Sequence, residues 1–376
     1  MPRLIAYYLP QYHPIPENDK WWGAGFTEWT NVAKAKPLFN GHYQPHFPAD
    51  LGYYDLRVPE VRVQQESMAK LYGIEGFMYY HYWFGNERLL LERPLKQMLS
   101  AKKDSFPFCL CWANESWKGV WHGEFTGKTL IEQTYPGKED YEKHFYYLID
   151  AFKDERYIKV DDKPVFNVYM PLNLPDLKEF TSLFNSLAIK EGFPGLYLVG
   201  SRCPIGWNPL QYGFSGVIGS EMASLRFKQR SYFNKKRIYL AKKIQSYTQQ
   251  LTKEKVFAEK KIPLVVEYEH IIDQLITDKS FGFDYYPCVV PNWDNTPRAG
   301  VNGLVFHNST PSLFGKHFRN ALQKVAHLPN ERQFVFIKSW NEWAEGNYLE
   351  PDKKFGFGYL EEIKEQLKEN SLAKFY

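Results

Sequence analysis

The sequence predicts a (β/α)8 barrel, an α/β fold in which parallel strands alternate with helices. Short apolar runs recur along the 376 residues, and helix-like or loop segments separate them. About eight such units close naturally into a barrel. No GxGxxG or GxxxxGK[ST] motif follows any of these runs, which disfavours a nucleotide-binding open sheet.

The strands are expected where the apolar residues concentrate. In chain order, these runs are Leu4–Leu9, Gly76–Phe84, Phe106–Ala113, Pro164–Met170, Gly195–Gly200, Gly216–Glu221, Tyr286–Pro291 and Gln333–Trp340. Helical periodicity between them covers Glu60–Tyr72, Glu87–Ala101, Glu139–Phe152, Leu174–Glu191, Ser312–Ala326 and Tyr359–Glu369. A long loop is expected from Pro10 to Pro59. The first of these helices is expected to bury Val61, Met68, Leu71 and Tyr72.

One domain over residues 1–376 is expected, because no low-complexity tract or flexible linker divides the chain. A basic helical insertion is expected at about 224–261. Between Arg226 and Lys261 there are twelve Lys and Arg against two Glu, a local charge of about +10. This segment is either a solvated helical face, which is the commoner case, or a contact for an anionic membrane surface or a lipid-linked glycan.

The aromatic content is unusually high. Eleven Trp, 27 Tyr and 28 Phe make up 18% of the residues, which indicates a cleft that stacks on flat ligands such as sugars or nucleobases. The net charge of +4 is too small to indicate nucleic acid. No signal peptide and no apolar run of 18 residues is visible, so a cytoplasmic protein is expected, with peripheral contact to the inner membrane face through the basic segment as a further hypothesis.

Aromatic and polar residues occur together where the predicted strands end, which is where barrel enzymes carry their sites. Aromatic planes beside carboxylates and amides are what a saccharide cleft needs. Each aromatic taken singly could equally fill the barrel mouth as core. The residues expected to line a sugar cleft are Tyr8, Gln11, Tyr12, His13, Trp22, Glu28, Trp29, His81, Tyr82, Trp83, Trp112, Asn114, Glu115, Trp293, Asp294, Trp340 and Asn341.

The most specific feature is Glu342 with Glu345, directly after the last predicted strand. Glycoside cleavage commonly uses two carboxyls, one as acid and one as base or nucleophile. If residues 342–345 turn helically, the carboxyls lie on one face and shift each other's pKa. If the strand continues, only one of them reaches the site. The non-functional alternative for this spacing is the solvent-exposed first turn of a helix.

Metals and cofactors are not predicted. Cys109, Cys111, Cys203 and Cys288 lack zinc-site spacing. Cys109 and Cys111 are expected to be buried on one face of a strand. The histidines are expected to be structural or substrate-contacting and not metal ligands, and no GxSxG motif marks a serine nucleophile.

Several motifs resemble those of the WbsX family. They are the segments 6–18 (AYYLPQYHPIPEN), 21–32 (WWGAGFTEWTNV), 79–84 (YYHYWF), 112–115 (WANE) and 340–352 (WNEWAEGNYLEPD). WbsX proteins are labelled glycosyltransferases of O-antigen or capsule gene clusters, and they are similar to glycoside hydrolase family 99, the endo-α-mannosidases, which are (β/α)8 barrels. The resemblance covers nearly the whole chain and is weakest at the basic insertion.

The resemblance to family 99 implies roles for the acidic pair. Glu345 would be the general acid/base at the leaving oxygen. Glu342 would deprotonate the sugar's own 2-hydroxyl, which attacks the anomeric carbon and gives a 1,2-anhydro sugar with overall retention. The residues favour a hydrolase, since no nucleotide-diphosphate cradle or DxD motif is visible. The alternatives are a glycosyltransferase that assembles the same polysaccharide and a non-catalytic carbohydrate-binding protein.

Overall fold

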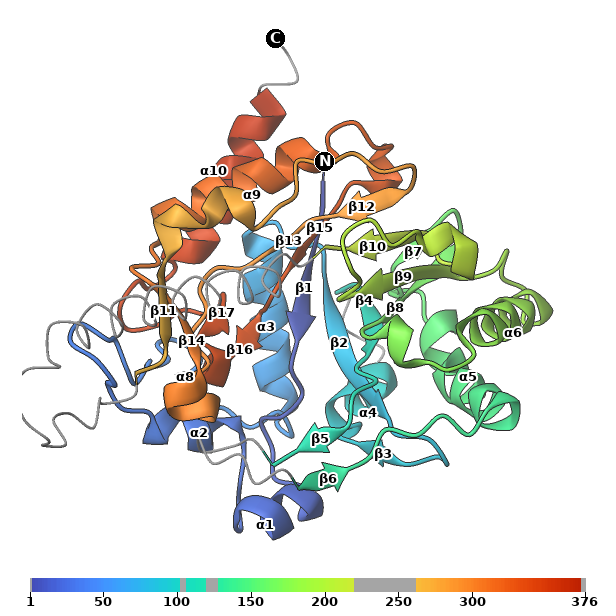
Figure 1. The fold of residues 1–376 in the computed structure, drawn as a ribbon, viewed down its shortest axis with the longest axis horizontal. Coiled ribbons are helices and arrows are strands. Elements are labelled where there is room, and N and C mark those ends of the chain that lie inside the picture. The colour runs from blue at the N-terminus through green and yellow to red at the C-terminus, as the bar shows by residue number, and fades with distance from the viewer. Residues whose placement is uncertain (1, 102–105, 120–127, 220–261, 373–376) are drawn as a thin grey trace, which may run out of the picture.

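The computed structural model describes residues 2–101, 106–119, 128–219 and 262–372. Within these residues, parallel strands form a ring with helices outside it, as predicted (Figure 1). The hydrogen-bonded path runs β12-β10-β9-β8-β4-β2-β1-β15-β13, and every neighbouring pair on it is parallel. The basic segment 226–261 and Glu221 lie outside the described residues.

The ring closes because its two end strands are consecutive in the chain. Only Pro287 separates β12 from β13; β12 pairs with β10 and β13 pairs with β15. Proline cannot donate a ladder hydrogen bond, so a break at this point is expected. The barrel strands are β1 (Arg3–Tyr8), β2 (Gly76–Trp83), β4 (Phe108–Trp112), β8 (Lys163–Val168), β9 (Tyr197–Ser201), β10 (Gly216–Ile218), β12 (Asp284–Tyr286), β13 (Cys288–Val289) and β15 (Phe334–Ile337).

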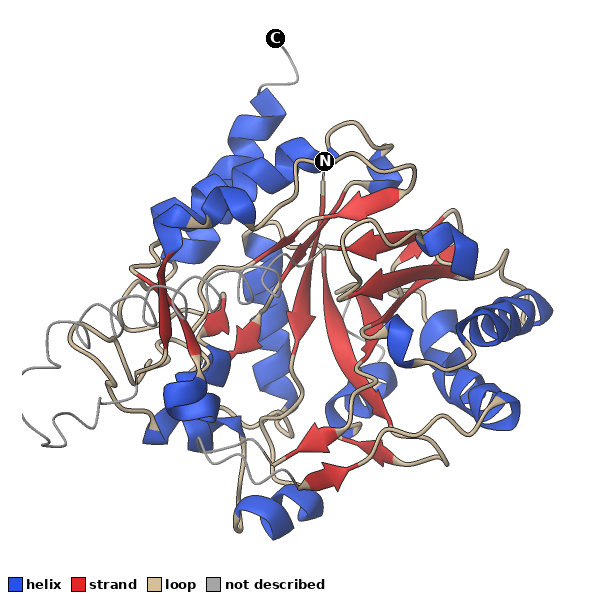
Figure 2. Cartoon of the chain, viewed as in Figure 1, coloured by secondary structure: helices blue, strands red, loops and turns tan. Residues whose placement is uncertain are grey.

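Helices cover the outside of the barrel, and further helices lie beside the ends of the strands (Figure 2). The outer helices are α3 (Pro59–Leu71), α4 (Arg93–Ser100), α5 (Lys138–Lys153), α6 (Leu177–Lys190), α9 (Pro311–Val325) and α10 (Gly358–Leu372). The short ones are α1 (Pro16–Trp22), α2 (Glu28–Lys34) and α8 (Thr296–Ala299). The 3-10 turns are Pro171–Asn173, Pro209–Tyr212, Tyr268–His270, Ile272–Gln274, Gly300–Asn302, Asn330–Arg332 and Trp343–Glu345.

Short strands lie outside the barrel path. They are β3 (Leu89–Leu90), β5 (Trp117–Lys118), β6 (Thr129–Ile131), β7 (Lys159–Val160), β11 (Leu264–Glu267), β14 (Leu304–His307), β16 (Asn341–Glu342) and β17 (Asn347–Tyr348). Of these, β3 and β7 pair with barrel strands, and the others form three separate two-stranded sheets. The parallel β11–β14 pair has its own small apolar cluster, including Val266 and Phe306. None of the helices in the described ranges is long and apolar enough to cross a membrane.

Side chains alternate between the barrel interior and the helix layer, and this alternation decides which residues reach the site. On β1, the Tyr7 hydroxyl lies 3.2 Å from Ser201 Oγ across the barrel, whereas the Tyr8 hydroxyl donates to Gln65 Oε1 on α3 at 2.7 Å. The thiols of Cys109 and Cys111 are buried, as predicted. Cys111 Sγ lies 2.9 Å from Asn167 Oδ1.

Three local predictions were wrong. The loop from Pro10 to Pro59 contains α1 and α2. The segment predicted as a helix from Glu87 begins with β3, which pairs with β2, and the helix starts only at Arg93. Leu71 is 63% exposed on α3. The helix buries Arg62, Gln65 and Glu66 instead, and the Gln65 amide is satisfied by the Tyr8 hydroxyl and by Glu350.

Candidate active site

Glu342 and Glu345 are brought together by the turn that follows β15. Glu342 ends β16, residues Trp343–Glu345 form a 3-10 turn, and the two carboxyls are hydrogen-bonded to each other. Gly346 closes the turn at φ +61°, and a Cβ at this position would lie 2.8 Å from the Asp294 backbone nitrogen. The turn is therefore helical in type, and both carboxyls face the same side.

The carboxylate of Glu342 is held by groups on β2 and in the segment directly after β15. Its Oε1 accepts hydrogen bonds from the Tyr80 hydroxyl at 3.0 Å and from Ser339 Oγ at 2.7 Å, and Lys338 Nζ lies 4.0 Å away. Burial alone would raise the pKa of Glu342. Lys338, the hydrogen bond with Glu345 and Arg298 outweigh burial and lower it to about 2. Glu342 is therefore ionised at neutral pH.

Glu345 is more accessible than Glu342, with side-chain exposures of 16% and 5%. Its Oε1 lies 2.8 Å from Arg298 Nη1. The same guanidinium also binds Glu28, a carboxylate with no exposed surface. Burial and the charge of Glu342 raise the pKa of Glu345 to about 7, against the opposing effect of Arg298. Glu345 can therefore carry a proton at neutral pH.

The charges of this cluster balance only when Glu345 is protonated. Arg298 and Lys338 supply two positive charges, and Glu28 and Glu342 supply two negative charges. Ionising Glu345 adds a third negative charge in a largely buried place, which is costly. Two neighbouring carboxyls whose pKa values are pushed apart are the arrangement that an acid and a base require.

Four of the predicted cleft residues lie around this cluster. Glu28 binds Arg298, and the charge of Glu342 raises the pKa of Tyr82 after the larger effect of burial. Lys338 Nζ lies 5.6 Å from the centre of the Trp293 ring. Glu115 is 3.9 Å from Arg202 Nη1, in a pair whose side chains are 41% and 44% exposed.

Other predicted residues support the turn that carries Glu342 and Glu345. The Tyr12 hydroxyl bonds the Asn341 carbonyl and accepts from the Trp343 backbone N–H at 3.2 Å. The Asn341 side chain bonds both backbone groups of Leu9, at 2.7 and 3.0 Å. The residues in this supporting position are Tyr12, Trp29, Asp294 and Asn341. The Trp340 ring packs on Phe77, and its carbonyl accepts from the Leu349 backbone N–H at 2.9 Å.

A third set of predicted residues points away from the acidic pair. His81 Nε2 lies 2.8 Å from His144 Nε2 on α5, and the Trp83 indole donates to Asp140 on the same helix. Tyr8 and Trp112 likewise contact the helix layer. Among the rest, Gln11, His13 and Asn114 are buried and Trp22 is partly exposed. The Asn114 amide bonds the backbone of Met170.

Sequence reasoning missed Tyr80, Lys338 and Arg298. Tyr80 and His81 are neighbours on β2, so their side chains point to opposite faces of the strand. The sequence alone does not tell which of the two faces the barrel interior. Lys338 could have been found from the sequence, because it is the one charged residue in the apolar run Gln333–Trp340. Arg298 follows β13 by several residues, and nothing local marks it.

A (β/α)8 barrel that carries two hydrogen-bonded carboxyls after its last strand has an arrangement compatible with glycoside chemistry. The comparisons agree with that chemistry. The family model described as "Glycosyltransferase WbsX" matches residues 4–363, and the chain belongs to this family. Two WxcX proteins from strains of Xanthomonas campestris pv. campestris are 33% and 34% identical over 97% of this chain. The chain spans about half, 49%, of the length of these relatives.

Solved structures share the fold at low sequence identity. Two structures of the GH99 endo-α-mannosidase from Bacteroides thetaiotaomicron, one of them in complex with bis-tris propane, match with TM-scores of 0.58 and 0.56 at 14% and 13% identity. Both matches cover 100% of this chain and 99% of the other. A glycoside hydrolase-like protein matches at TM-score 0.53 and 16% identity, over 97% and 93% of the two chains. The family and the fold together indicate a carbohydrate-active enzyme.

Proposed function

We propose that the chain cleaves glycosidic bonds of a bacterial polysaccharide of O-antigen or capsule type, with retention of configuration. The observation that carries the proposal is the hydrogen-bonded pair Glu342 and Glu345, in which one carboxyl is ionised and the other holds a proton near neutral pH. The family and the similarity to endo-α-mannosidases favour a sugar as the substrate.

In the proposed reaction the two carboxyls act in two steps. The Glu342 carboxylate takes the proton of the sugar 2-hydroxyl, and that oxygen attacks the anomeric carbon. The glycosidic bond breaks as Glu345 gives its proton to the leaving oxygen. Glu345, now ionised, deprotonates a water that opens the 1,2-anhydro sugar, and Glu342 returns its proton to the 2-oxygen. Each proton is accounted for, and the configuration is retained after two inversions.

The test is turnover of the polysaccharide from the organism that carries the gene, measured as new reducing ends. Glu345→Gln is expected to abolish turnover while glycan binding persists, because the amide keeps the shape of the side chain but cannot donate the acid's proton. Glu361→Gln, an exposed change on α10, is the matched control. A near-normal rate in Glu345→Gln would refute the assignment.

The family description favours a second candidate, a glycosyltransferase that acts on the same class of polysaccharide. In that case the basic segment 226–261 would contact an anionic membrane or a lipid-linked acceptor in the cytoplasm. Thermal stabilisation by a nucleotide sugar would support this candidate, since a ligand that binds the folded state raises the melting temperature. No shift with UDP-, GDP- or dTDP-linked sugars would exclude those donors.

A further inference from the structure

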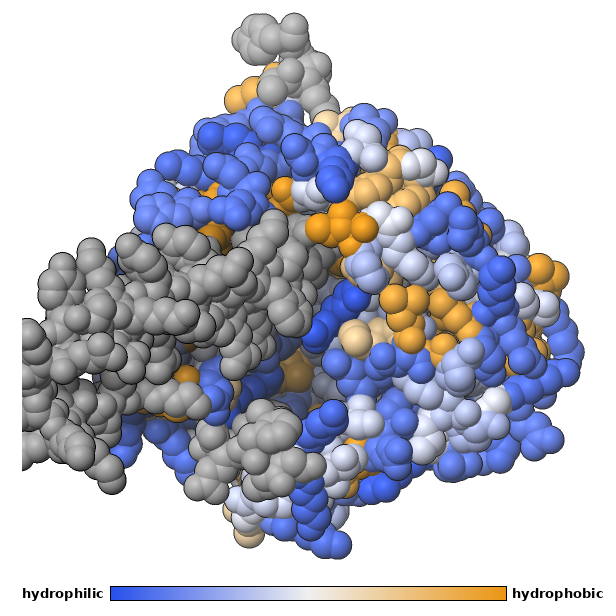
Figure 3. Space-filling model, viewed as in Figure 1, coloured by the Kyte–Doolittle hydropathy of each residue, from blue (hydrophilic) through white to orange (hydrophobic). Residues whose placement is uncertain are grey.

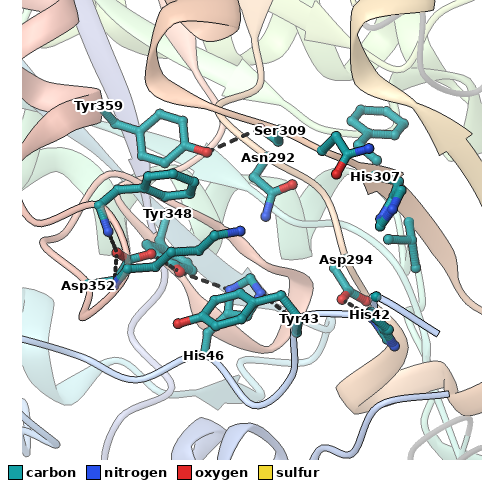
Figure 4. A pocket seen from close by; sticks show the side chains of 16 residues that line it. His42, Tyr43, His46, Asn292, Asp294, His307, Ser309, Tyr348, Asp352 and Tyr359 are labelled. Carbon is teal, nitrogen blue, oxygen red and sulfur yellow. Dashed lines mark hydrogen bonds and ion pairs between the residues drawn. The ribbon is translucent and has the colours of Figure 1, made fainter. Parts of the chain in front are cut away.

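A second pocket lies on the other side of the wall that carries the acidic pair. It is lined from the loop before α3, from the segments after β13 and β14, and from the chain that leads to α10 (Figure 4). The Asp294 backbone N–H donates to the Glu345 carbonyl at 2.7 Å, and Tyr348 lies on β17, which pairs with the strand that carries Glu342. The two sites therefore share this wall.

The carboxylates in the wall of the pocket are already satisfied. Asp294 accepts from His42 and Gln44 at Oδ2, and from the backbone and hydroxyl of Thr296 at Oδ1. Asp352 accepts from the Tyr348 hydroxyl at Oδ2, and from two backbone N–H groups at Oδ1. Their oxygens are directed at protein donors, so the pocket is not arranged as a cation site.

Three other polar groups are left for a ligand. In the part of the chain that the structure describes, no hydrogen bond is found for the side chains of Asn292, His307 or Lys354. The Asn292 amide points into the pocket in Figure 4. The Lys354 ammonium lies 4.4 Å from the centre of the Tyr43 ring and 4.7 Å from that of Phe355. An amide, an imidazole and an ammonium beside aromatic faces offer both donors and acceptors, as a polyhydroxylated ligand requires.

The volume of the pocket and the charges around it limit which ligand it can hold. The pocket volume is about 60 Å³, and a single water needs roughly 10–15 Å³ on the same measure. It therefore holds about four to six water-sized groups, which is the hydroxyl-bearing edge of one sugar ring. The surrounding carboxylates, Asp294 and Asp352, disfavour an anion, because a single ammonium at the rim does not outweigh them.

We propose that this pocket binds one neutral sugar unit of the glycan, outside the site of bond cleavage. The proposal rests on the proposed function for the identity of the glycan, and its chemistry stands on three polar groups that make no hydrogen bond within the described residues. Asn292, His307 and the Lys354 ammonium would bond the hydroxyls of the sugar.

The experiment is a titration of the ¹⁵N-histidine-labelled chain with glucose, galactose, mannose, rhamnose and N-acetylglucosamine in turn, followed by the His307 resonances. At least one of these sugars is expected to bind and shift His307. Asn292→Ala is expected to weaken that binding about tenfold or more. Asn330→Ala, an exposed change on a 3-10 turn, is expected to leave it unchanged. If Asn292→Ala does not fold, His307→Gln with ligand-observed detection takes its place.

Three results would overturn the proposal: no sugar binds, Asn292→Ala binds as the parent does, or only inorganic phosphate shifts His307. The binding test is independent of turnover. Sugar binding that needs Asn292, in a protein that cleaves no glycan, would refute the proposed function and keep the pocket. Cleavage that depends on Glu345, in a protein whose pocket binds no sugar, would refute the pocket proposal and keep the proposed function.

Discussion

Replacing Arg298 is expected to raise the pKa of Glu345, because the guanidinium is the positive group that opposes its burial. At a hydrogen-bonded contact of 2.8 Å the two charges lie about 4 Å apart. At an effective dielectric constant of about 20 their attraction is about 4 kcal/mol, which corresponds to about three pKa units at most. Since Glu28 shares the guanidinium, we expect a rise of about one to two units.

Replacing Arg298 requires a second substitution, at Glu28, to keep the protein folded. Arg298→Met alone leaves Glu28 buried and unpaired, at a cost of about 3–5 kcal/mol. The double variant Arg298→Met/Glu28→Gln removes both charges. Glu28→Gln alone leaves the guanidinium to Glu345, so the pKa of Glu345 is expected to fall. If the ion pair with Arg298 controls the pKa of Glu345, this pKa shifts in opposite directions in the two variants.

The assay is an NMR titration of ¹³C-carboxyl-labelled glutamates, with the Glu345 signal assigned from the Glu345→Gln variant. It needs no substrate. Where turnover is measured, the basic limb of the pH–rate profile is expected to move with the same sign, because the acid must be protonated to work. An unchanged Glu345 pKa in both variants would refute the reasoning.

Three further changes test other parts of the site. Lys338→Met is expected to raise the pKa of Glu342, so the acid limb of the pH–rate profile moves to higher pH; an unmoved limb would contradict the pairing. Tyr80→Phe removes one donor to Glu342 and is expected to lower kcat about tenfold or more with little change in melting temperature, whereas an unchanged kcat would argue against its role. Gly346→Ala is expected to cost about 1–3 kcal/mol in chemical unfolding, because φ is +61° and the Cβ would meet Asp294; a cost under about 0.5 kcal/mol would show that the turn adapts.

The barrel could be predicted because its signal is spread over the whole chain. Eight apolar runs of strand length, most of them separated by a helical segment, leave few alternative topologies. The placement of Glu342 and Glu345 at the end of the last strand followed from the same order. The described surface in Figure 3 is mostly hydrophilic and is hollowed near the centre of the view.

The contacts within the site could not be predicted. They depend on which face of a strand each side chain occupies and on pairs of residues that are far apart in the sequence. The motif around His81 contains aromatic residues on both faces of β2, and only the pairing of the Tyr80 hydroxyl with Glu342 distinguishes them. The ion pair of Glu28 with Arg298 joins residues 270 positions apart. The aromatic content therefore overstates the number of rings near the acidic pair, since many of them pack against helices or against the turn 343–345.

The most direct test of the central claim is the configuration of the first-formed product, followed by ¹H NMR during cleavage of the polysaccharide. Two successive displacements at the anomeric carbon, with Glu342 and Glu345 as base and acid, predict that the newly formed reducing end first appears with the configuration of the bond that was cleaved. First appearance of the opposite anomer would contradict the proposed mechanism.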